Sequence, residues 1–300
     1  MRFLLVDGYY YAFRSFYAMP SLSTRSGEPT NAIYGLTIVI RRMLADLQPD
    51  FGAVVFDGGL PADRIALRSD YKANRPEIPN ALKVQIPWLK ELLKALGLTP
   101  IEVEGQEADD VIATYTKKAI EKNIDVVLAT NDKDLLSLIG PHVSAYTVEK
   151  KKFRLITEKD IEEKWLVHPW QLPDLLALTG DSVDNIPGVP GIGKKTAAKW
   201  ISRYGSLSAL LNASDIPDKR FAQLIEENKE LIMTNYKMLE LKNDIPLPIP
   251  IEELRIKPNY AEQERLFKRF EFKKLAEALK EHPEKKSSEK SSENTDILFG

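Results

Sequence analysis

Nine acidic residues stand at the boundaries between the structural segments that the sequence predicts. Each lies near the end of a short apolar run or the start of a helix-like segment, and they are Asp7, Asp57, Glu107, Asp109, Asp110, Asp132, Asp134, Asp181 and Asp184. Carboxylates packed together repel one another at neutral pH unless cations neutralise them. Mg²⁺ prefers hard oxygen ligands, and two such ions about 4 Å apart can hold both the attacking and the leaving oxygen of a phosphoryl displacement. The acids therefore predict a divalent-metal site for phosphoryl transfer.

A single acid at such a boundary also has a structural explanation. The stretch EADDVIAT puts Glu107, Asp109 and Asp110 at a helix start, where the positive end of the helix dipole stabilises acids. An acid that follows a strand is commonly a turn or cap residue. A calcium loop is excluded, because NDKDLLSLI lacks the D-x-[DN]-x-[DN]-G pattern. A structural role stays open for each acid alone, whereas nine acids at matching places favour one common site.

The first half of the chain predicts an α/β fold that can bring these acids together. Apolar, β-branched-rich runs predict strands at 2–7, 51–57 and 125–130, and helical periodicity predicts helices at 31–47, 80–96 and 107–121. This alternation predicts a mostly parallel sheet with helices on its faces. Because ligands bind beyond the carboxyl ends of such strands, Asp7, Asp57, Asp132 and Asp134 are expected at one edge.

The second half of the chain predicts a helical domain. From about residue 158 the pattern is mostly helical and is broken by Gly and Pro, notably in 179–206, and a Pro-rich stretch at 243–254 precedes a last helix near 260–280. GDSVDN adds Asp181 and Asp184 just past a helix end. Residues 281–300 are Ser, Lys and Glu with little to bury, so we expect them to be disordered.

A glycine-rich turn in this half predicts a phosphate contact. Gly188, Gly193 and Lys194 satisfy G-x-x-x-x-G-K, but Lys195 stands where a P-loop requires Ser or Thr, and no strand precedes the turn. A turn between helices can instead hold a phosphate through its N–H groups and the next helix N-terminus. No acid occurs in 185–214, which contains Lys194, Lys195, Lys199 and Arg203. This favours a DNA-backbone contact, and a solvated basic helix face is the alternative.

A second basic segment lies at 64–77. Arg64, Arg68, Lys72 and Arg75 recur at spacings of four, four and three, with Tyr71 among them. Cations on one helical face with an aromatic neighbour suit single-stranded nucleic acid, through phosphate contacts and base stacking. A polar surface loop is the alternative.

Composition excludes several other chemistries. The chain has no cysteine, which excludes disulfides, a thiolate nucleophile and a sulfur-bound zinc, and its 3 histidines are too scattered for a histidine metal cluster. With 42 basic and 44 acidic residues the net charge of −2 gives no global nucleic-acid signal. No apolar run reaches the roughly 18 residues of a membrane span, and the start lacks signal-peptide features, so we expect a cytoplasmic protein with no membrane contact.

Seven motifs in order resemble those of a known enzyme family. LLVDG, VVFD, SDYKANRP, EADDVIAT, DKDLL, LTGDSVDNIPGVPGIGKKTA and YGSL closely resemble the 5′-nuclease domain of bacterial DNA polymerase I and stand-alone 5′–3′ exonucleases, over about residues 1–280. The resemblance implies a PIN-like α/β core with a helical arch, and a helix-three-turn-helix (SAM-like) module that grips duplex DNA. It implies a catalytic domain at 1–168, a DNA-binding domain at 169–280 and a disordered tail at 281–300.

The resemblance also assigns residues. It makes the nine acids ligands of two or more Mg²⁺ ions, for which Mn²⁺ can substitute, with Asp181 and Asp184 completing the second ion site. Lys72 and Arg75 match residues that engage the scissile phosphate, with Tyr71 beside them and Arg64 carried over. The implied substrate-binding turn, which can also bind K⁺ through carbonyls, is formed by Gly188, Gly191, Gly193, Lys194, Lys195 and Thr196, with Lys199 following.

The implied function is a structure-selective 5′–3′ exonuclease and 5′-flap endonuclease in replication and repair. Its implied substrates are nucleoid DNA with 5′ flaps, nicks or RNA primers, and because the sequence stops at Gly300 we expect a separate polymerase. DRIA replaces the family's usual Phe-Arg-His-Glu, so of these four only Arg64 carries over. Ile297, Leu298 and Phe299 loosely resemble sliding-clamp-binding peptides, without the usual Gln. A PIN-type ribonuclease and a non-catalytic DNA-junction binding protein are the alternatives.

Overall fold

The structure, a computed structural model, describes residues 1–149 and 152–280. The tail predicted at 281–300 lies outside these residues. The chain divides into two compact units. Of the described residues, unit 1 comprises 1–8, 55–77 and 101–253, and unit 2 comprises 9–54, 78–100 and 254–280.

Four strands of unit 1 lie in the order β1-β4-β5-β6. They are β1 (Arg2–Asp7), β4 (Asp125–Ala129), β5 (Val143–Glu149) and β6 (Lys152–Ile156). β1 pairs parallel with β4 and β4 with β5, whereas β6 runs antiparallel to β5. Residues Phe3 to Val6 of β1 are at most 1% exposed, as expected of a strand covered on both faces.

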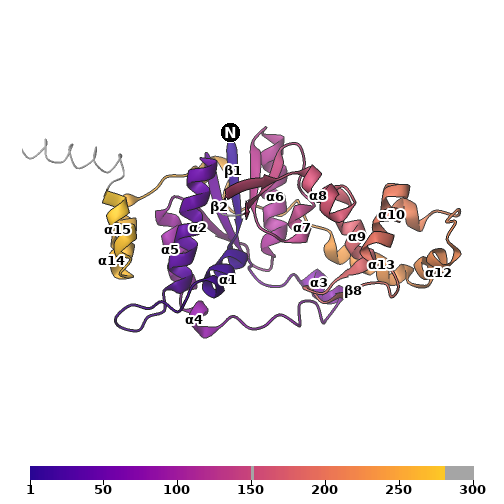
Figure 1. The fold of residues 1–300 in the computed structure, drawn as a ribbon, viewed down its shortest axis with the longest axis horizontal. Helices are drawn as coiled ribbons and strands as arrows, with labels where there is room; N and C mark the ends of the chain where they lie inside the picture. The colour runs from indigo at the N-terminus through magenta and orange to yellow at the C-terminus, as the bar shows by residue number, and fades with distance from the viewer. Residues whose placement is uncertain (150–151, 281–300) are drawn as a thin grey trace, which may run out of the picture. The chain divides into compact units, whose positions relative to one another are not determined.

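Helix α6 (Ala108–Glu121) packs against β1 and β4 (Figure 1). Tyr115 of this helix meets Phe3 of β1 edge to face at 5.9 Å between ring centroids. The other two strands of the sheet, β2 (Phe51–Phe56) and β3 (Thr99–Glu102), each pass from unit 2 into unit 1 along the chain. Two short helices of unit 1 follow strands β2 and β4, namely α3 (Ala62–Leu67) and α7 (Lys133–Leu136).

The rest of unit 1 is mainly helical, with one short hairpin, and its helices α9, α10, α12 and α13 gather together in Figure 1. Its elements are α8 (Glu158–Trp165), η1 (Pro169–Gln171), α9 (Leu172–Thr179), β7 (Gly180–Asp181), β8 (Ile186–Pro187), α10 (Lys194–Tyr204), α11 (Leu207–Leu211), α12 (Lys219–Glu227) and α13 (Lys229–Leu239). Helix α9 packs against α10 and α13.

The hairpin of β7 and β8 is tight and firmly anchored. A Cβ on Gly180 would lie 2.3 Å from the backbone nitrogen of Gly188, and Gly180 has φ +75°, so glycine is required there. Asn235 of α13 is fully buried and donates to the carbonyls of Ala177 at 3.0 Å and Pro187 at 2.7 Å. One amide therefore ties the end of α9 to the end of the hairpin.

Unit 2 is mainly helical. Its helices are α1 (Gly8–Ala18), α2 (Asn31–Leu47), α4 (Asn80–Lys83), α5 (Ile86–Ala95), α14 (Tyr260–Arg269) and α15 (Lys273–Lys280). Helix α1 begins at Gly8, the last residue of the first segment of unit 1, and the short helix η2 (Ile251–Leu254) lies where the chain passes from unit 1 to unit 2. Helix α5 packs against α2 and α14. Buried Gln85, between α4 and α5, accepts from the N–H groups of Ala32 and Ile33, which fixes this break against the start of α2.

Some predicted elements are confirmed and others are wrong. The strand at 2–7 and the helix at 31–47 are found with the predicted bounds. The helix predicted at 80–96 is broken into α4 and α5, and the last helix is broken at Phe270–Phe272. The basic segment at 64–77 does not form one helical face, because α3 ends at Leu67 and residues 69–74 form turns.

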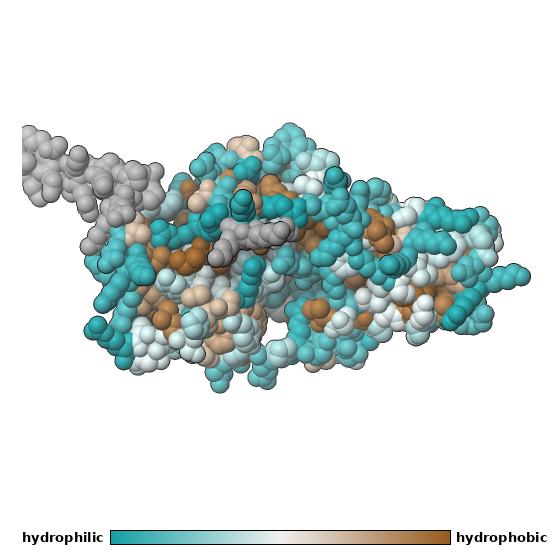
Figure 2. Space-filling view, in the orientation of Figure 1, coloured by the Kyte–Doolittle hydropathy of each residue, from teal (hydrophilic) through white to brown (hydrophobic). Residues whose placement is uncertain are grey.

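The surface shown in Figure 2 is mostly hydrophilic, with hydrophobic residues in small separate areas. Among the described residues, no helix is both long and apolar enough to cross a bilayer.

Candidate active site

The ends of β1 and β2 carry the first two predicted acids. Asp7 is the last residue of β1, and its Oδ2 lies 3.5 Å from the hydroxyl of Thr130, which follows β4. Asp57 follows β2 and accepts a hydrogen bond of 2.8 Å from the N–H of Ala108 at the start of α6. This bond brings the end of β2 to the helix that carries Asp109 and Asp110.

Helix α7 positions Asp132 and Asp134. Asp132 caps this helix, because its Oδ1 accepts from the backbone N–H of Asp134 at 2.9 Å. The Oδ1 atom of Asp134 is buried and has no hydrogen-bond partner among the described residues. A buried carboxylate oxygen without a donor is costly unless a cation or a proton satisfies it.

Asp109 and Asp134 each lie among other predicted acids of the site. Burial raises the pKa of Asp109 well above its ordinary value, and Asp132, Asp7 and Asp57 raise it further. Burial likewise raises the pKa of Asp134, and Asp132, Asp184 and Asp181 add to the effect. These seven carboxylates from five segments therefore lie close enough to repel one another.

Glu107 and Asp110 are held by a buried arginine. Arg64 donates to both Asp110 oxygens, at 2.8 and 2.9 Å, and also contacts Glu107. The residues are 4% (Arg64), 1% (Glu107) and 0% (Asp110) exposed. Asp110 additionally accepts from the N–H of Lys242 at 3.0 Å. Arg64 therefore lies inside the protein, where it pairs with both acids.

Lys72 lies between Glu107 and Asp184. Its ammonium contacts Glu107 and is 3.7 Å from Asp184 Oδ2. Burial lowers the pKa of Lys72, but Asp184 and Glu107 outweigh it and leave the pKa above its ordinary value, so the side chain stays charged. Its backbone has φ 54°, the left-handed region that non-glycine residues rarely adopt, at a cost of about 1–3 kcal/mol. This strained conformation directs Lys72 into the acid cluster.

Tyr71 and Arg75 flank Lys72 and differ in exposure. The Tyr71 residue is 4% exposed, and its hydroxyl donates to Glu107 at 3.2 Å, so its ring offers no free face to a base in this structure. Arg75 is 41% exposed and donates to Asp184 at 2.7 Å. Arg75 is thus the one of the two predicted phosphate-binding cations that is open to solvent.

The segment with Asp181 and Asp184 is fixed to the segment that follows α3. Lys133 lies 2.6 Å from Asp181 Oδ1, and Asn74 donates to the carbonyl of Ser182 at 2.9 Å. Asn185 donates to the carbonyl of Asp70 at 2.9 Å. Sequence reasoning missed Lys133, although its place between Asp132 and Asp134 was the available signal.

The cluster fits divalent cations, but not as a preformed cage. Among residues 1–149 and 152–280, no three acid or histidine side chains stand ready as a metal-ligand set. Three of the predicted ligands, Glu107, Asp110 and Asp181, are instead in ion pairs with Arg64, Lys72 and Lys133. Carboxylate oxygens, including Oδ1 of Asp134, which has no hydrogen-bond partner among the described residues, are the hard donors that suit a divalent cation.

The predicted glycine turn precedes α10. Gly188 is required by close packing, because its Cβ would lie 2.2 Å from the Thr179 carbonyl oxygen. Gly191 has φ +90°, and Gly193 is the N-cap of α10, with open space around it. Lys194 donates to the Lys164 carbonyl at 2.5 Å and lies over the Trp165 ring. Lys195, Thr196 and Lys199 follow on α10, and the DNA-contact role of this group stays a prediction.

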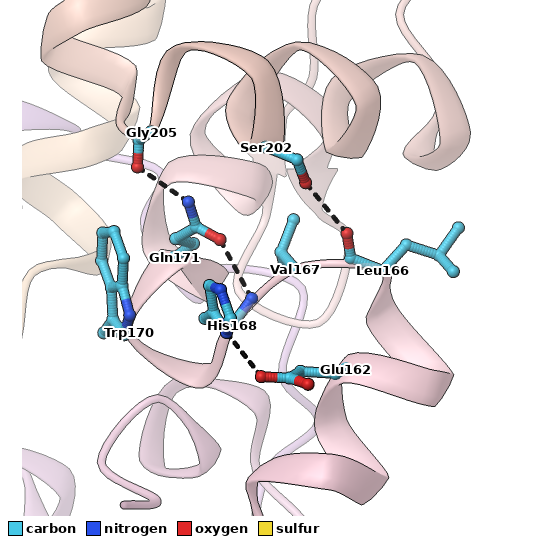
Figure 3. A pocket seen from close by; sticks show the side chains of 8 residues that line it. All are labelled: Glu162, Leu166, Val167, His168, Trp170, Gln171, Ser202 and Gly205. Carbon is cyan, nitrogen blue, oxygen red and sulfur yellow. Dashed lines mark hydrogen bonds and ion pairs between the residues drawn. The ribbon is translucent and has the colours of Figure 1, made fainter.

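A separate pocket of about 450 Å³ lies between the end of α8 and α10 (Figure 3). His168 stacks on Trp170 at 6.1 Å between ring centroids and contacts Glu162 at 2.5 Å. Gln171 donates to the carbonyl of Gly205 at 2.7 Å. None of the predicted site residues lines this pocket, so it is distinct from the acid cluster.

Comparisons with known proteins agree with this geometry. A family model for the 5′–3′ exonuclease N-terminal resolvase-like domain matches residues 2–166, and one for the 5′–3′ exonuclease C-terminal SAM fold matches 167–262. A 5′–3′ exonuclease of Aquifex aeolicus is 37% identical over 272 residues, 90% of this chain and 92% of that protein. DNA polymerase I of Mycobacterium bovis is 38% identical over 281 residues, 92% of this chain, which spans 31% of that polymerase.

Solved structures show the same architecture. A zinc-bound 5′-exonuclease of T5 aligns with a TM-score of 0.65 and 26% identity, over 81% of this chain and 90% of that chain. A bacteriophage T5 flap endonuclease in complex with DNA and metal ions aligns with a TM-score of 0.66, over 93% of this chain and 98% of that one, and at 23% identity it supports the fold alone. The mostly parallel sheet flanked by helices, with its SAM-fold second part, is thus confirmed. Because two family models together match most of its length, this chain belongs to the 5′–3′ exonuclease family.

Proposed function

We propose that this chain is a Mg²⁺-dependent 5′ nuclease that hydrolyses phosphodiester bonds in DNA with 5′ flaps, nicks or RNA primers. The observation that carries the proposal is the cluster of mutually repelling carboxylates, with the unpartnered Asp134 oxygen, placed beside the cations Lys72 and Arg75. Acids alone would repel a phosphodiester. Acids that bind divalent ions, next to fixed cations, can attract and polarise one.

In this proposal the acidic side chains bind the metal ions and the basic side chains act on the phosphate. Asp7, Asp57, Asp109, Asp132 and Asp134 would hold the ions, together with the hairpin acids Asp181 and Asp184. Bound Mg²⁺ supplies a water of lowered pKa and neutralises charge on the phosphate oxygens. Glu107 is paired with Arg64 and Lys72, Asp110 is paired with Arg64, and these two acids are the remaining ligand candidates. Lys72 and Arg75 offset charge that develops on the phosphate, as fixed positive groups do in phosphoryl transfer.

The helical part of unit 1 would hold the duplex. Gly191, Gly193 and the first turn of α10 present backbone N–H groups, and Lys195 and Lys199 add charge, so this region suits a phosphate backbone whatever its sequence. We propose 1–168 as the catalytic domain and 169–280 as the duplex-binding domain, with K⁺ as a ligand of the 188–196 turn.

The test is cleavage of a 5′-flap duplex labelled at each end, with Mg²⁺ or with chelator. Asp134→Asn keeps the size of the side chain and removes its charge, and Asp244→Asn, at an exposed position, is the matched control. We expect Mg²⁺-dependent cutting at the flap junction by the native chain and the control, and none by Asp134→Asn, which should still bind the DNA. Binding without cutting by the native chain would favour a junction-binding protein, and preferential cutting of free RNA would favour a PIN-type ribonuclease.

We propose one further partner in the bacterial cytoplasm, a sliding clamp, because the sequence near Ile297, Leu298 and Phe299 loosely resembles clamp-binding peptides. Removal of residues 294–300 should lower the affinity for the clamp and leave flap cleavage unchanged. Equal clamp binding by the shortened chain would remove this partner.

A further inference from the structure

A polar pocket of about 490 Å³ opens beside the acid cluster in unit 1. Its lining includes Arg68, Lys133, Thr179, Ser182, Asn185 and Gly188. Three of these are sequence neighbours of predicted metal ligands: Lys133 separates Asp132 from Asp134, Ser182 follows Asp181, and Asn185 follows Asp184. A group bound in the pocket would therefore lie next to the reacting phosphodiester.

Two cations reach this pocket with hydrogen-bonding capacity to spare. Arg68 uses its Nε and one Nη2 hydrogen on Asp70, at 3.2 and 3.0 Å, and a guanidinium has five N–H donors. Lys133 gives one contact to Asp181, at 2.6 Å, and an ammonium has three donors. The side chains are 20% and 25% exposed, so each is partly covered and partly open. The planar guanidinium of Arg68 and the compact ammonium of Lys133 line one polar pocket, and these two cationic groups together suit a phosphodiester.

Asp70 holds Arg68 in position without belonging to the acid cluster. Its carboxylate accepts hydrogen bonds from the Arg68 guanidinium and a further hydrogen bond of 3.2 Å from the side-chain amide of Asn185. It is 53% exposed, and it competes with any anion for Arg68. A neutral residue here would free the guanidinium for such an anion.

We propose that this pocket binds a backbone phosphate of the substrate strand next to the one that is cleaved, through Arg68 and Lys133. This deepens the proposed nuclease function and rests on it. Both residues are positioning residues, because they hold the neighbouring phosphate and do not touch the reacting atoms.

The test is the salt dependence of flap-DNA binding, measured by fluorescence anisotropy with chelator present so that no DNA is cut. Arg68→Met and Lys133→Met should each weaken binding several-fold. Each should also make the negative slope of log K against log [KCl] shallower by about 0.7–0.9, the change expected when one phosphate contact is lost. Lys133→Arg should restore the slope. Lys159→Met, at an exposed lysine of α8, is the control and should change neither quantity.

Asp70→Asn separates substrate contact from a structural ion pair. If Arg68 binds phosphate, Asp70→Asn should tighten DNA binding several-fold. If the pair only maintains the fold, Asp70→Asn and Arg68→Met should weaken binding alike, with unchanged slopes, and the proposal would be overturned. Flap cleavage by the native chain combined with unchanged slopes in both methionine variants would also overturn it and leave the nuclease function standing. A native chain that neither binds nor cuts flap DNA would overturn both.

Discussion

The Arg64 guanidinium and the Asp110 carboxylate form a buried two-point ion pair, with Nη1–Oδ2 and Nη2–Oδ1 distances of 2.9 and 2.8 Å. Their side chains are 5% and 0% exposed. Removing one partner of such a pair leaves a buried charge without compensation. Arg64 therefore acts on the stability of the site as well as on its charge.

Arg64→Met should destabilise the protein by about 3–5 kcal/mol, the usual effect of breaking a buried pair. Urea denaturation followed by circular dichroism would measure this loss. Arg42→Met removes an exposed pair with Asp46 on α2 and should cost only about 0.3–0.5 kcal/mol. Losses of equal size would show that the Arg64 pair is not buried in solution.

Asp134→Asn should stabilise the protein in chelator, because it removes one of the mutually repelling carboxylates. Mg²⁺ should then raise the melting temperature of the native chain and raise that of the variant less. Binding to the folded state adds about 2.7 kcal/mol of stability at a ligand concentration of 100 times Kd. Thermal melting with and without Mg²⁺ checks this, and equal Mg²⁺ shifts in both proteins would argue against Asp134 as a ligand.

Lys72→Met should slow single-turnover flap cleavage by about 100-fold, the effect typical of removing one fixed group that stabilises transition-state charge. Binding of the flap should change much less, because Lys72 is buried against Glu107 and Asp184. Arg75→Met removes a half-exposed cation and should affect binding and cleavage more evenly. Rapid-quench kinetics and anisotropy separate the two effects, and equal losses for Lys72→Met would leave it a binding role only.

Asp174 predicts a pH dependence of stability away from the acid cluster. Burial raises its pKa above the ordinary value of 3.8, only partly offset by the hydrogen bond of 2.9 Å from the N–H of Leu207. The folded state then binds the proton more tightly than the unfolded state, so this stability is full below the ordinary pKa and is lost as the pH rises through the folded pKa.

Asp174→Asn keeps a hydrogen-bond acceptor and removes the titration. The variant should gain stability relative to the native chain as the pH rises from about 4 to about 7. Denaturant midpoints across this range would measure the difference. Asp244→Asn serves as the exposed control, and a constant difference between native chain and Asp174→Asn would contradict the raised pKa.

Strong local patterns made the sheet and several helices predictable. The β-branched run at 2–7 and the amphipathic segment at 31–47 need only their own residues to specify a buried strand and a one-sided helix. The helix predicted at 80–96 is broken because Pro87, in the first turn of α5, has no N–H to continue the hydrogen-bond ladder from α4. The proline is a local signal of this break, whereas the contact that buried Gln85 makes with the start of α2 joins residues 53 positions apart and has no local signal.

The acids of the site were predictable by type and place, and their partners were not. The position of Asp57 after an apolar run indicated a sheet edge, and its bond to Ala108 agrees with that. The regular spacing of Arg64, Arg68, Lys72 and Arg75 suggested one exposed helical face. Instead, Arg64 and Lys72 turn inward to buried carboxylates, Arg64 from helix α3 and Lys72 from a left-handed backbone conformation in the turn after it. A side chain's tertiary partners overrode its local periodicity.

The buried amide of Asn235 has a mechanical consequence. It fastens the last turn of α9 and the end of the β7–β8 hairpin to the middle of α13. Asp181 and Asp184 lie in this hairpin and the loop within it, so their positions are tied to those of α9 and α13. A ligand that displaces α13 would therefore displace the carboxylates of Asp181 and Asp184 together with the helix.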